Sequence, residues 1–146
     1  MHIERLYPAA LVNPEVLVQQ LTMAVPAGYP NPGQDFATDP LSIVDLLVPN
    51  PKTTFFARVA GYSMTGAGIE PGDIAIADRS LEARDGDIVV AVLDGMLTIK
   101  RLVRQRGTWA LKAENPEYPD VVVDELSELV IWSAIPASVR LHRPLR

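Results

Sequence analysis

Proline and glycine interrupt this chain from end to end, and they constrain its fold more than any other feature. The 146 residues include 13 prolines and 9 glycines, which are scattered and form no repeat. Because proline cannot donate a helical hydrogen bond and glycine favours turns, long helices are disfavoured. Apolar residues still make up 48% of the chain, which is enough to bury a core. The pattern therefore predicts a mainly β protein of short strands and tight turns.

Residues 1–38 are expected to form an extended N-terminal arm, with the folded domain at 39–146. Five prolines fall between positions 8 and 32 and block any long helix there. The stretch 25–33 should be extended or turned and exposed, which is the kind of backbone that proteases cut. One short helix is predicted to follow, with Asp39 as its N-cap and Pro40 in its first turn. Apolar residues then recur at helical spacing: Leu41, Val44, Leu47 and Val48.

From residue 54 onward the pattern becomes one of strands separated by turns. Asp94-Gly95 is a two-residue hairpin signal, so 88–93 should pair with 97–103. Strands of this number and length predict a compact β-barrel or sandwich. The expected strands are 54–60, 74–77, 88–93, 97–103, 108–113, 121–123 and 129–135, with 139–142 as a candidate last strand.

Several kinds of active site are excluded by composition. The chain has no cysteine, so it has no disulfide, thiolate metal site or cysteine nucleophile. The only histidines are His2 and His142, so a Ser-His-Asp triad would need a chain terminus as its base. Residue clusters that hold catalytic metals are also missing. We therefore expect neither a metal nor a cofactor.

Ser63 is a candidate nucleophile within the glycine-rich stretch 61–68. This stretch lacks the lysine of a phosphate-binding loop and the second glycine of a hydrolase elbow, so Ser63 alone could be an ordinary turn hydroxyl. Arginine stays protonated, so a base must come from Lys52, Lys100 or Lys112. Lys100 is favoured because its apolar neighbours could bury it, which would lower its pKa and let it accept the Ser63 proton. Position alone leaves open that Lys100 faces water.

Charge and hydropathy predict a cytoplasmic protein with no membrane anchor. The net charge is -5, whereas a dedicated nucleic-acid binder usually carries a basic face, so direct specific DNA binding is not expected. No apolar run approaches the roughly 18 residues that span a bilayer. The first five residues also lack the layout of a signal peptide.

Taken together and in order, several short motifs resemble the LexA/UmuD family of Ser-Lys autopeptidases. That resemblance implies a largely β peptidase domain with an N-terminal arm, in which Ser63 is the nucleophile and Lys100 the base. It also implies that the backbone N–H groups of Tyr62 and Ser63 hold the oxyanion, and that the bond cut is Ala27–Gly28. The matching segments are Gly61-Tyr62-Ser63-Met64, Thr98-Ile99-Lys100-Arg101, 26–30, 69–73, 85–89 and 94–95.

The resemblance further implies a role in the bacterial response to DNA damage. The segment before Ala27 is too short and proline-broken for a helix-turn-helix domain, which favours the UmuD-like branch over a repressor. The implied partners are a RecA–single-stranded-DNA filament that stimulates cleavage, a second copy in a homodimer and a UmuC-type error-prone polymerase. Two alternatives stay open: a catalytically silent module of the same fold that binds a polymerase or regulator, and a signal-peptidase-like enzyme, which the missing anchor argues against.

Overall fold

The computed structural model describes residues 1–9, 17–21, 38–123 and 128–143. The chain divides into two compact units. The smaller unit is Val12–Pro49, and the larger unit is Met1–Leu11 together with Asn50–Arg146. The larger unit contains both of the proposed catalytic residues.

The smaller unit holds a two-stranded ribbon and the single α-helix of the described residues. Strand β2 (Leu17–Leu21) pairs antiparallel with β3 (Thr38–Ser42), and α1 (Ile43–Leu47) follows directly. The prediction of one short helix is confirmed, but its predicted N-cap is wrong. The helix begins after Ser42, whose hydroxyl accepts a hydrogen bond of 3.1 Å from the Asp45 N–H. Asp39 and Pro40 instead lie in β3, because the serine hydroxyl satisfies a free donor of the first turn.

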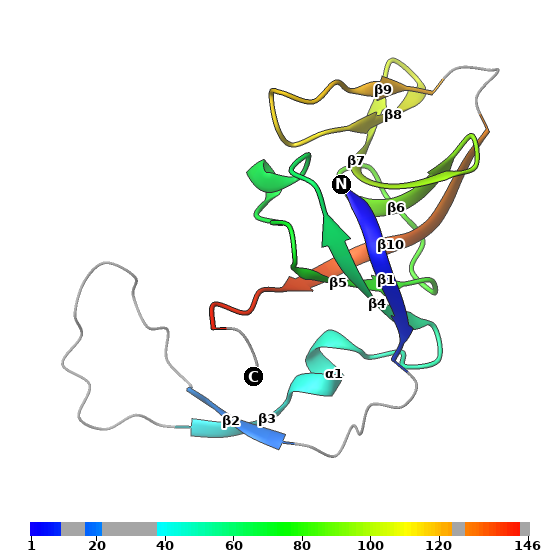
Figure 1. The fold of residues 1–146 in the computed structure, drawn as a ribbon. Coiled ribbons are helices and arrows are strands. Elements are labelled where there is room, and N and C mark those ends of the chain that lie inside the picture. Colours follow the sequence, from blue (N-terminus) through cyan, green and yellow to red (C-terminus); the bar gives the residue numbers. More distant parts are fainter. Residues whose placement is uncertain (10–16, 22–37, 124–127, 144–146) are drawn as a thin grey trace. The chain divides into compact units, whose positions relative to one another are not determined.

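The larger unit is built on one eight-stranded antiparallel sheet (Figure 1). The prediction of a mainly β fold is therefore confirmed. Its strands run in the spatial order β1-β4-β5-β10-β6-β7-β8-β9. The strand bounds are β1 His2–Pro8, β4 Thr54–Ala60, β5 Ile74–Asp78, β6 Ile88–Leu93, β7 Met96–Gln105, β8 Thr108–Lys112, β9 Val121–Val122 and β10 Leu129–Val139.

Strand β1 lies in the stretch 1–38, which was predicted to be an extended arm. It pairs antiparallel with β4, from His2 opposite Ala60 to Pro8 opposite Phe55, with a bulge between Ile3 and Arg5. Within the described residues, β1 is thus an edge strand of the main sheet.

Local turn chemistry produces the central hairpin. Asp94 and Gly95 join β6 to β7 with φ angles of 49° and 82°, and β6 pairs with β7 from Ile88–Arg101 to Leu93–Met96. Both turn residues adopt the left-handed conformation that a two-residue hairpin requires. The predicted pairing is confirmed.

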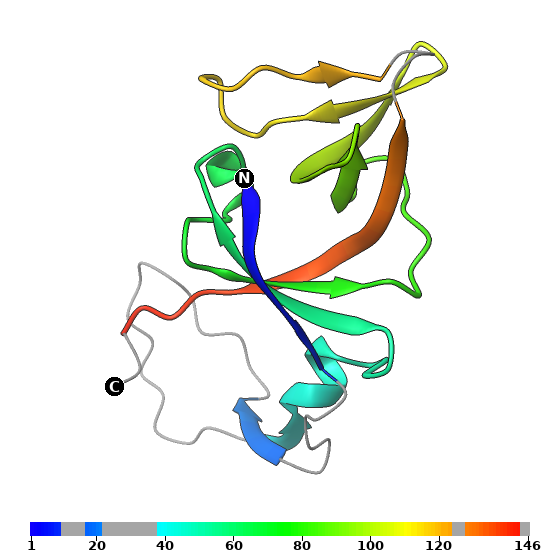
Figure 2. The ribbon, with the colours of Figure 1, turned by 45° about the vertical axis from the view of Figure 1, so that its right-hand side comes forward.

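Strand β10 connects the two halves of the sheet (Figure 2). Its first half pairs with β6 and its second half with β5, and the register shifts between Ile131 and Ser133 and again between Ala134 and Ala137. Such bulges bend a strand and increase its twist. One long bent strand therefore runs to Val139, and the separate strand predicted at 139–142 does not form.

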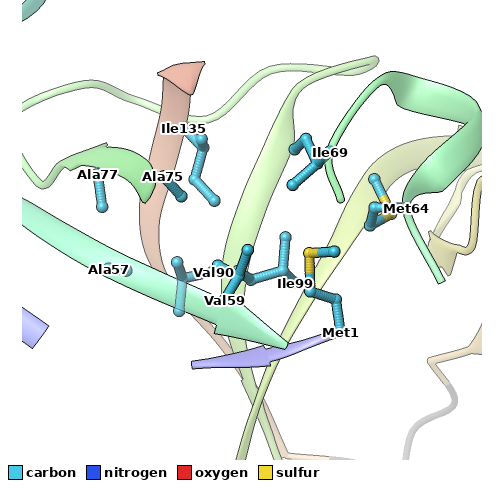
Figure 3. Close-up of a cluster of buried hydrophobic side chains, with 10 residues drawn as sticks. All are labelled: Met1, Ala57, Val59, Met64, Ile69, Ala75, Ala77, Val90, Ile99 and Ile135. Atoms are coloured by element: carbon cyan, nitrogen blue, oxygen red, sulfur yellow. The ribbon is translucent and has the colours of Figure 1, made fainter. Parts of the chain in front are cut away.

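The main core lies between strands that are distant in sequence (Figure 3). Its central side chains are fully buried, as in the cases of Val59, Met64 and Ile99. Burying such side chains contributes about 1.5–3 kcal/mol each. The cluster comprises Met1, Ala57, Val59, Met64, Ile69, Ala75, Ala77, Val90, Ile99 and Ile135.

Candidate active site

The loop after β4 carries Ser63 into the protein interior. Gly61 has a φ of 88°, a left-handed conformation that turns the chain out of the strand. A short 3₁₀ turn over Thr65–Ala67 follows. Between them, Ser63 is fully buried and its neighbour Met64 packs in the main core. The nucleophile candidate is therefore held by a packed loop.

Residues just after β8 fix this loop through hydrogen bonds to its backbone. The Glu114 N–H donates to the Ser63 carbonyl at 2.8 Å, and the Gly66 N–H donates to the Glu114 carbonyl at 2.7 Å. The Asn115 amide donates to the Tyr62 carbonyl at 2.9 Å. The N–H groups of Tyr62 and Ser63 donate to no other described residue through the backbone. Within the described residues, these two adjacent amides therefore have no backbone acceptor, and an oxyanion hole needs donors of this kind.

Lys100 lies on β7 and is only 9% exposed. Burial lowers the pKa of its amine, because a low-dielectric environment disfavours the ammonium ion, while the carboxylate of Asp120 opposes this shift. The ring of Tyr118 lies 5.8 Å from Nζ. The buried environment therefore favours the neutral amine, which is the form that can act as a base.

Ser63 and Lys100 share a neighbour, the backbone amine of Met1. This amine donates a short hydrogen bond to Ser63 Oγ. Its pKa is lowered to about 6, first by burial and second by repulsion from the Lys100 charge. The Met1 amine is thus hydrogen-bonded to the serine hydroxyl and lies close enough to Lys100 for the two groups to interact electrostatically.

The other sequence-based candidates are placed as follows. Tyr62 is 58% exposed, so it can offer its backbone while its side chain lies at the surface. Ala27 and Gly28 lie outside the described residues. His2 is exposed on β1, and among the described residues Ser63 Oγ receives a hydrogen bond from Met1 and not from a histidine.

No metal or membrane site emerges from the described part of the chain. It contains no group of three or more His, Cys, Asp or Glu side chains arranged to hold a metal ion. Nor does any helix within it have the length and apolarity needed to cross a bilayer.

Five residues that shape the site were not foreseen from the sequence. Two act through backbone groups, two act from a distance and Asn115 makes a single side-chain hydrogen bond, so their residue types form no recognisable motif. Asn115-Pro116 is a turn signal but says nothing of what the turn contacts. The residues are Gly66, Glu114, Asn115, Tyr118 and Asp120. All five line one pocket of about 460 Å³ beside the site, and neither Ser63 nor Lys100 lines it.

The residue types at this site are those that acyl transfer uses. Such a reaction needs a nucleophilic hydroxyl, a base and oxyanion donors, for which the buried Ser63, Lys100 with its lowered pKa and the two loop amides are the candidates. A base with a pKa near the working pH contributes about 10²–10⁴-fold to the rate.

Comparison with known proteins identifies the family. The model of the family described as Peptidase S24-like matches residues 17–135. Protein ImpA of Salmonella typhimurium is 39% identical over 93 residues, which are 63% of this chain and 64% of that protein. Protein MucA of Escherichia coli is 36% identical over 119 residues, or 81% of each chain. The LexA repressor of Dechloromonas aromatica is 46% identical over 74 residues, which are 51% of this chain and 37% of the repressor.

The matched region includes the nucleophile loop and all of β7. The resemblance first seen in a few motifs therefore extends over most of the chain. This protein belongs to the Peptidase S24-like family, within the LexA/UmuD group of that family.

Proposed function

We propose that the chain is a UmuD-like protein of the SOS response that cleaves itself between Ala27 and Gly28. The observation that carries the proposal is that Ser63 and Lys100 are both buried polar residues and that each interacts with the Met1 amine. Burial lowers the pKa of Lys100 and so favours its neutral form, and a neutral amine can accept the proton of the Ser63 hydroxyl.

The reaction is an acyl transfer in two steps. Neutral Lys100 accepts the Ser63 proton as Oγ attacks the Ala27 carbonyl carbon, and the amides of Tyr62 and Ser63 stabilise the oxyanion. The C–N bond to Gly28 then breaks, and the lysine ammonium returns the proton to the leaving amine. A water molecule, deprotonated by Lys100, hydrolyses the ester and releases residues 1–27 with a new carboxyl terminus.

The proposed context is cytoplasmic DNA-damage tolerance. A RecA–single-stranded-DNA filament would favour the docked cleavage segment without donating catalytic groups. The shortened protein would form a homodimer and serve as the accessory subunit of a UmuC-type polymerase. Its contact with DNA would then be indirect, in keeping with its acidic net charge.

Intact mass after alkaline incubation, with and without the filament, tests the chemistry. Loss of residues 1–27 is expected from the wild type and not from Ser63→Ala or Lys100→Arg, because arginine cannot become neutral. The chain offers matched controls: Ser133→Ala changes another buried serine, and Lys112→Arg changes an exposed lysine on the next strand. Both controls should cleave at the wild-type rate.

The outcomes separate the proposal from its alternatives. A Lys100→Arg protein that cuts normally would show that another group is the base. Normal cleavage of Gly28→Lys would show that the bond lies elsewhere. No cleavage under any condition would support a catalytically silent binding module of the same fold.

A further inference from the structure

Residue Met1 at the start of β1 occupies the polar centre of the candidate active site. Its amine donates to Ser63 Oγ, and its carbonyl accepts hydrogen bonds from the Ile99 N–H at 3.1 Å and the Thr98 hydroxyl at 3.4 Å. Its side chain is buried in the main core beside Met64 and Ile99 (Figure 3). Strand β1 then continues along the edge of β4.

A peptide approaching Ser63 needs these same positions. An extended substrate binds by adding to exposed strand edges, where its carbonyls accept backbone N–H groups and its side chains enter neighbouring pockets. The edge of β4 and the Ile99 N–H provide such contacts next to the dyad, and β1 uses both. The Met1 atom that contacts Ser63 Oγ is its nitrogen, whereas the Met1 carbonyl oxygen is bound by the Ile99 N–H, so the Met1 carbonyl is not presented to Ser63 for cleavage.

We propose that β1 is a built-in competitor for the cleavage segment, so that Ser63 can act only when β1 leaves the edge of β4. This inference rests on the proposed self-cleavage and adds a regulatory step to it. Strand β1 and the proposed cleavage bond Ala27–Gly28 both lie within residues 1–28.

Beyond Met1, β1 is only weakly attached to β4. It is an edge strand, paired on one side with β4. Arg5 lies directly opposite Arg58, and like charges at opposed positions weaken strand pairing. The side chains of Leu6 and Tyr7 are 40% and 45% exposed, so they bury little apolar surface. The apolar attachment is therefore concentrated at the two ends of the segment, in Met1 and the partly buried Ile3 at its start and in the buried Ala9 just after it, whose N–H donates to the Thr54 carbonyl at 2.9 Å.

Cleavage would make the release permanent. Because β1 precedes Ala27, cutting the Ala27–Gly28 bond severs the competitor from the domain. A processed protein would keep an open edge on β4, which any extended segment of a partner could then use.

A reversible cross-link tests the proposal. The chain has no cysteine, so the double variant Arg5→Cys, Arg58→Cys contains a single thiol pair at directly opposed positions. Oxidation should lock β1 in place, because opposed residues of antiparallel strands lie within disulfide range, about 4.5–5.5 Å between Cα atoms. We expect the locked form to self-cleave at least about tenfold more slowly than the same protein after reduction. The two single-cysteine variants, treated with the same oxidant, should be unaffected.

A loosening variant gives the opposite readout. Ile3→Asp removes an apolar contact of β1 and should speed both self-cleavage and the reaction of Ser63 with a fluorophosphonate probe. Glu4→Gln is the matched control, because Glu4 is exposed on the same strand. Melting curves of both variants verify that the domain remains folded.

The outcomes distinguish the two proposals. If locked and reduced forms cleave and label equally, β1 is a structural strand and the inference is overturned, while the peptidase proposal stands. If no form cleaves or labels, including Ile3→Asp, the peptidase proposal fails and this inference fails with it.

Discussion

Replacing Gly66 with alanine tests whether the contact between the nucleophile loop and Glu114 positions Ser63. The variant should slow self-cleavage by more than its loss of stability explains. A Cβ at this position would lie 2.5 Å from the carbonyl oxygen of Glu114, a backbone atom that cannot simply rotate away. The Gly66 φ is not in the left-handed region, so the cost is a steric clash and not backbone strain. Relief requires Glu114 and the loop to move apart.

The size of the effect follows from the contacts that such movement weakens. Two backbone hydrogen bonds join the segments, from Gly66 to Glu114 at 2.7 Å and from Glu114 to Ser63 at 2.8 Å. At about 0.5–1.5 kcal/mol each, their loss costs about 1–3 kcal/mol of unfolding free energy. For a domain of this size the melting temperature should fall by about 4–12 °C. Displacing Ser63 by about 1 Å should slow cleavage roughly 100-fold.

Self-cleavage by intact mass and melting by circular dichroism measure the two effects. Gly68→Ala is the matched control. A Cβ there meets no atom within 4 Å, so the only cost of the substitution is the strain of alanine at a φ of 82°. It should lower the melting temperature by a similar amount and leave cleavage near the wild-type rate. A Gly66→Ala protein that cleaves normally would refute the argument that the contact with Glu114 positions Ser63.

Two further predictions concern charge. Asp120→Asn should shift the pH–rate profile of self-cleavage to lower pH, because its carboxylate raises the pKa of Lys100; an unchanged profile, or a shift upward, would contradict this role. Arg140→Leu should lower the free energy of unfolding at pH 7 in denaturant titrations, because it leaves the buried Asp73 carboxylate without its ion pair at 2.8 Å. Burial raises the pKa of Asp73, but hydrogen bonds led by that from Arg140 outweigh it and hold the pKa below its usual range. The deficit should therefore shrink as the pH falls below about 4, where an unfolded aspartate takes up its proton, and a deficit independent of pH would point to lost packing instead.

The part of the fold that could be predicted is the part encoded locally. The strand at 54–60 and the hairpin around Asp94-Gly95 follow from alternation and turn chemistry within a few residues, and both form as predicted. Strand β1 could not be predicted in this way. Its sequence, HIERLYP, exposes most of its side chains, and it becomes a strand only because the distant β4 offers a free edge. Such pairing depends on tertiary context and leaves little trace in local pattern.

The candidate site also contains some residues that the sequence could predict and others that it could not. Lys100 could be proposed from the sequence because the chain has only three lysines, and Ser63 because the motif around it resembles that of a known family. Glu114 contributes its backbone N–H and C=O, which every non-proline residue possesses, so nothing in its identity marks it. Whether the serine and lysine act as a dyad stays a prediction for the cleavage assay.

Because the site is buried, its polar groups need hydrogen-bond partners, and β1 supplies them. With the site empty but dry, Ser63 Oγ and the Ile99 N–H would lose their partners, and each unsatisfied buried group costs about 1–3 kcal/mol. An occupant is therefore needed in both the resting and the reacting states. If β1 and the cleavage segment make equivalent hydrogen bonds, exchanging one for the other changes the free energy little. A population shift of about tenfold then needs only about 1.4 kcal/mol from an activating partner, which is within the reach of a few surface contacts.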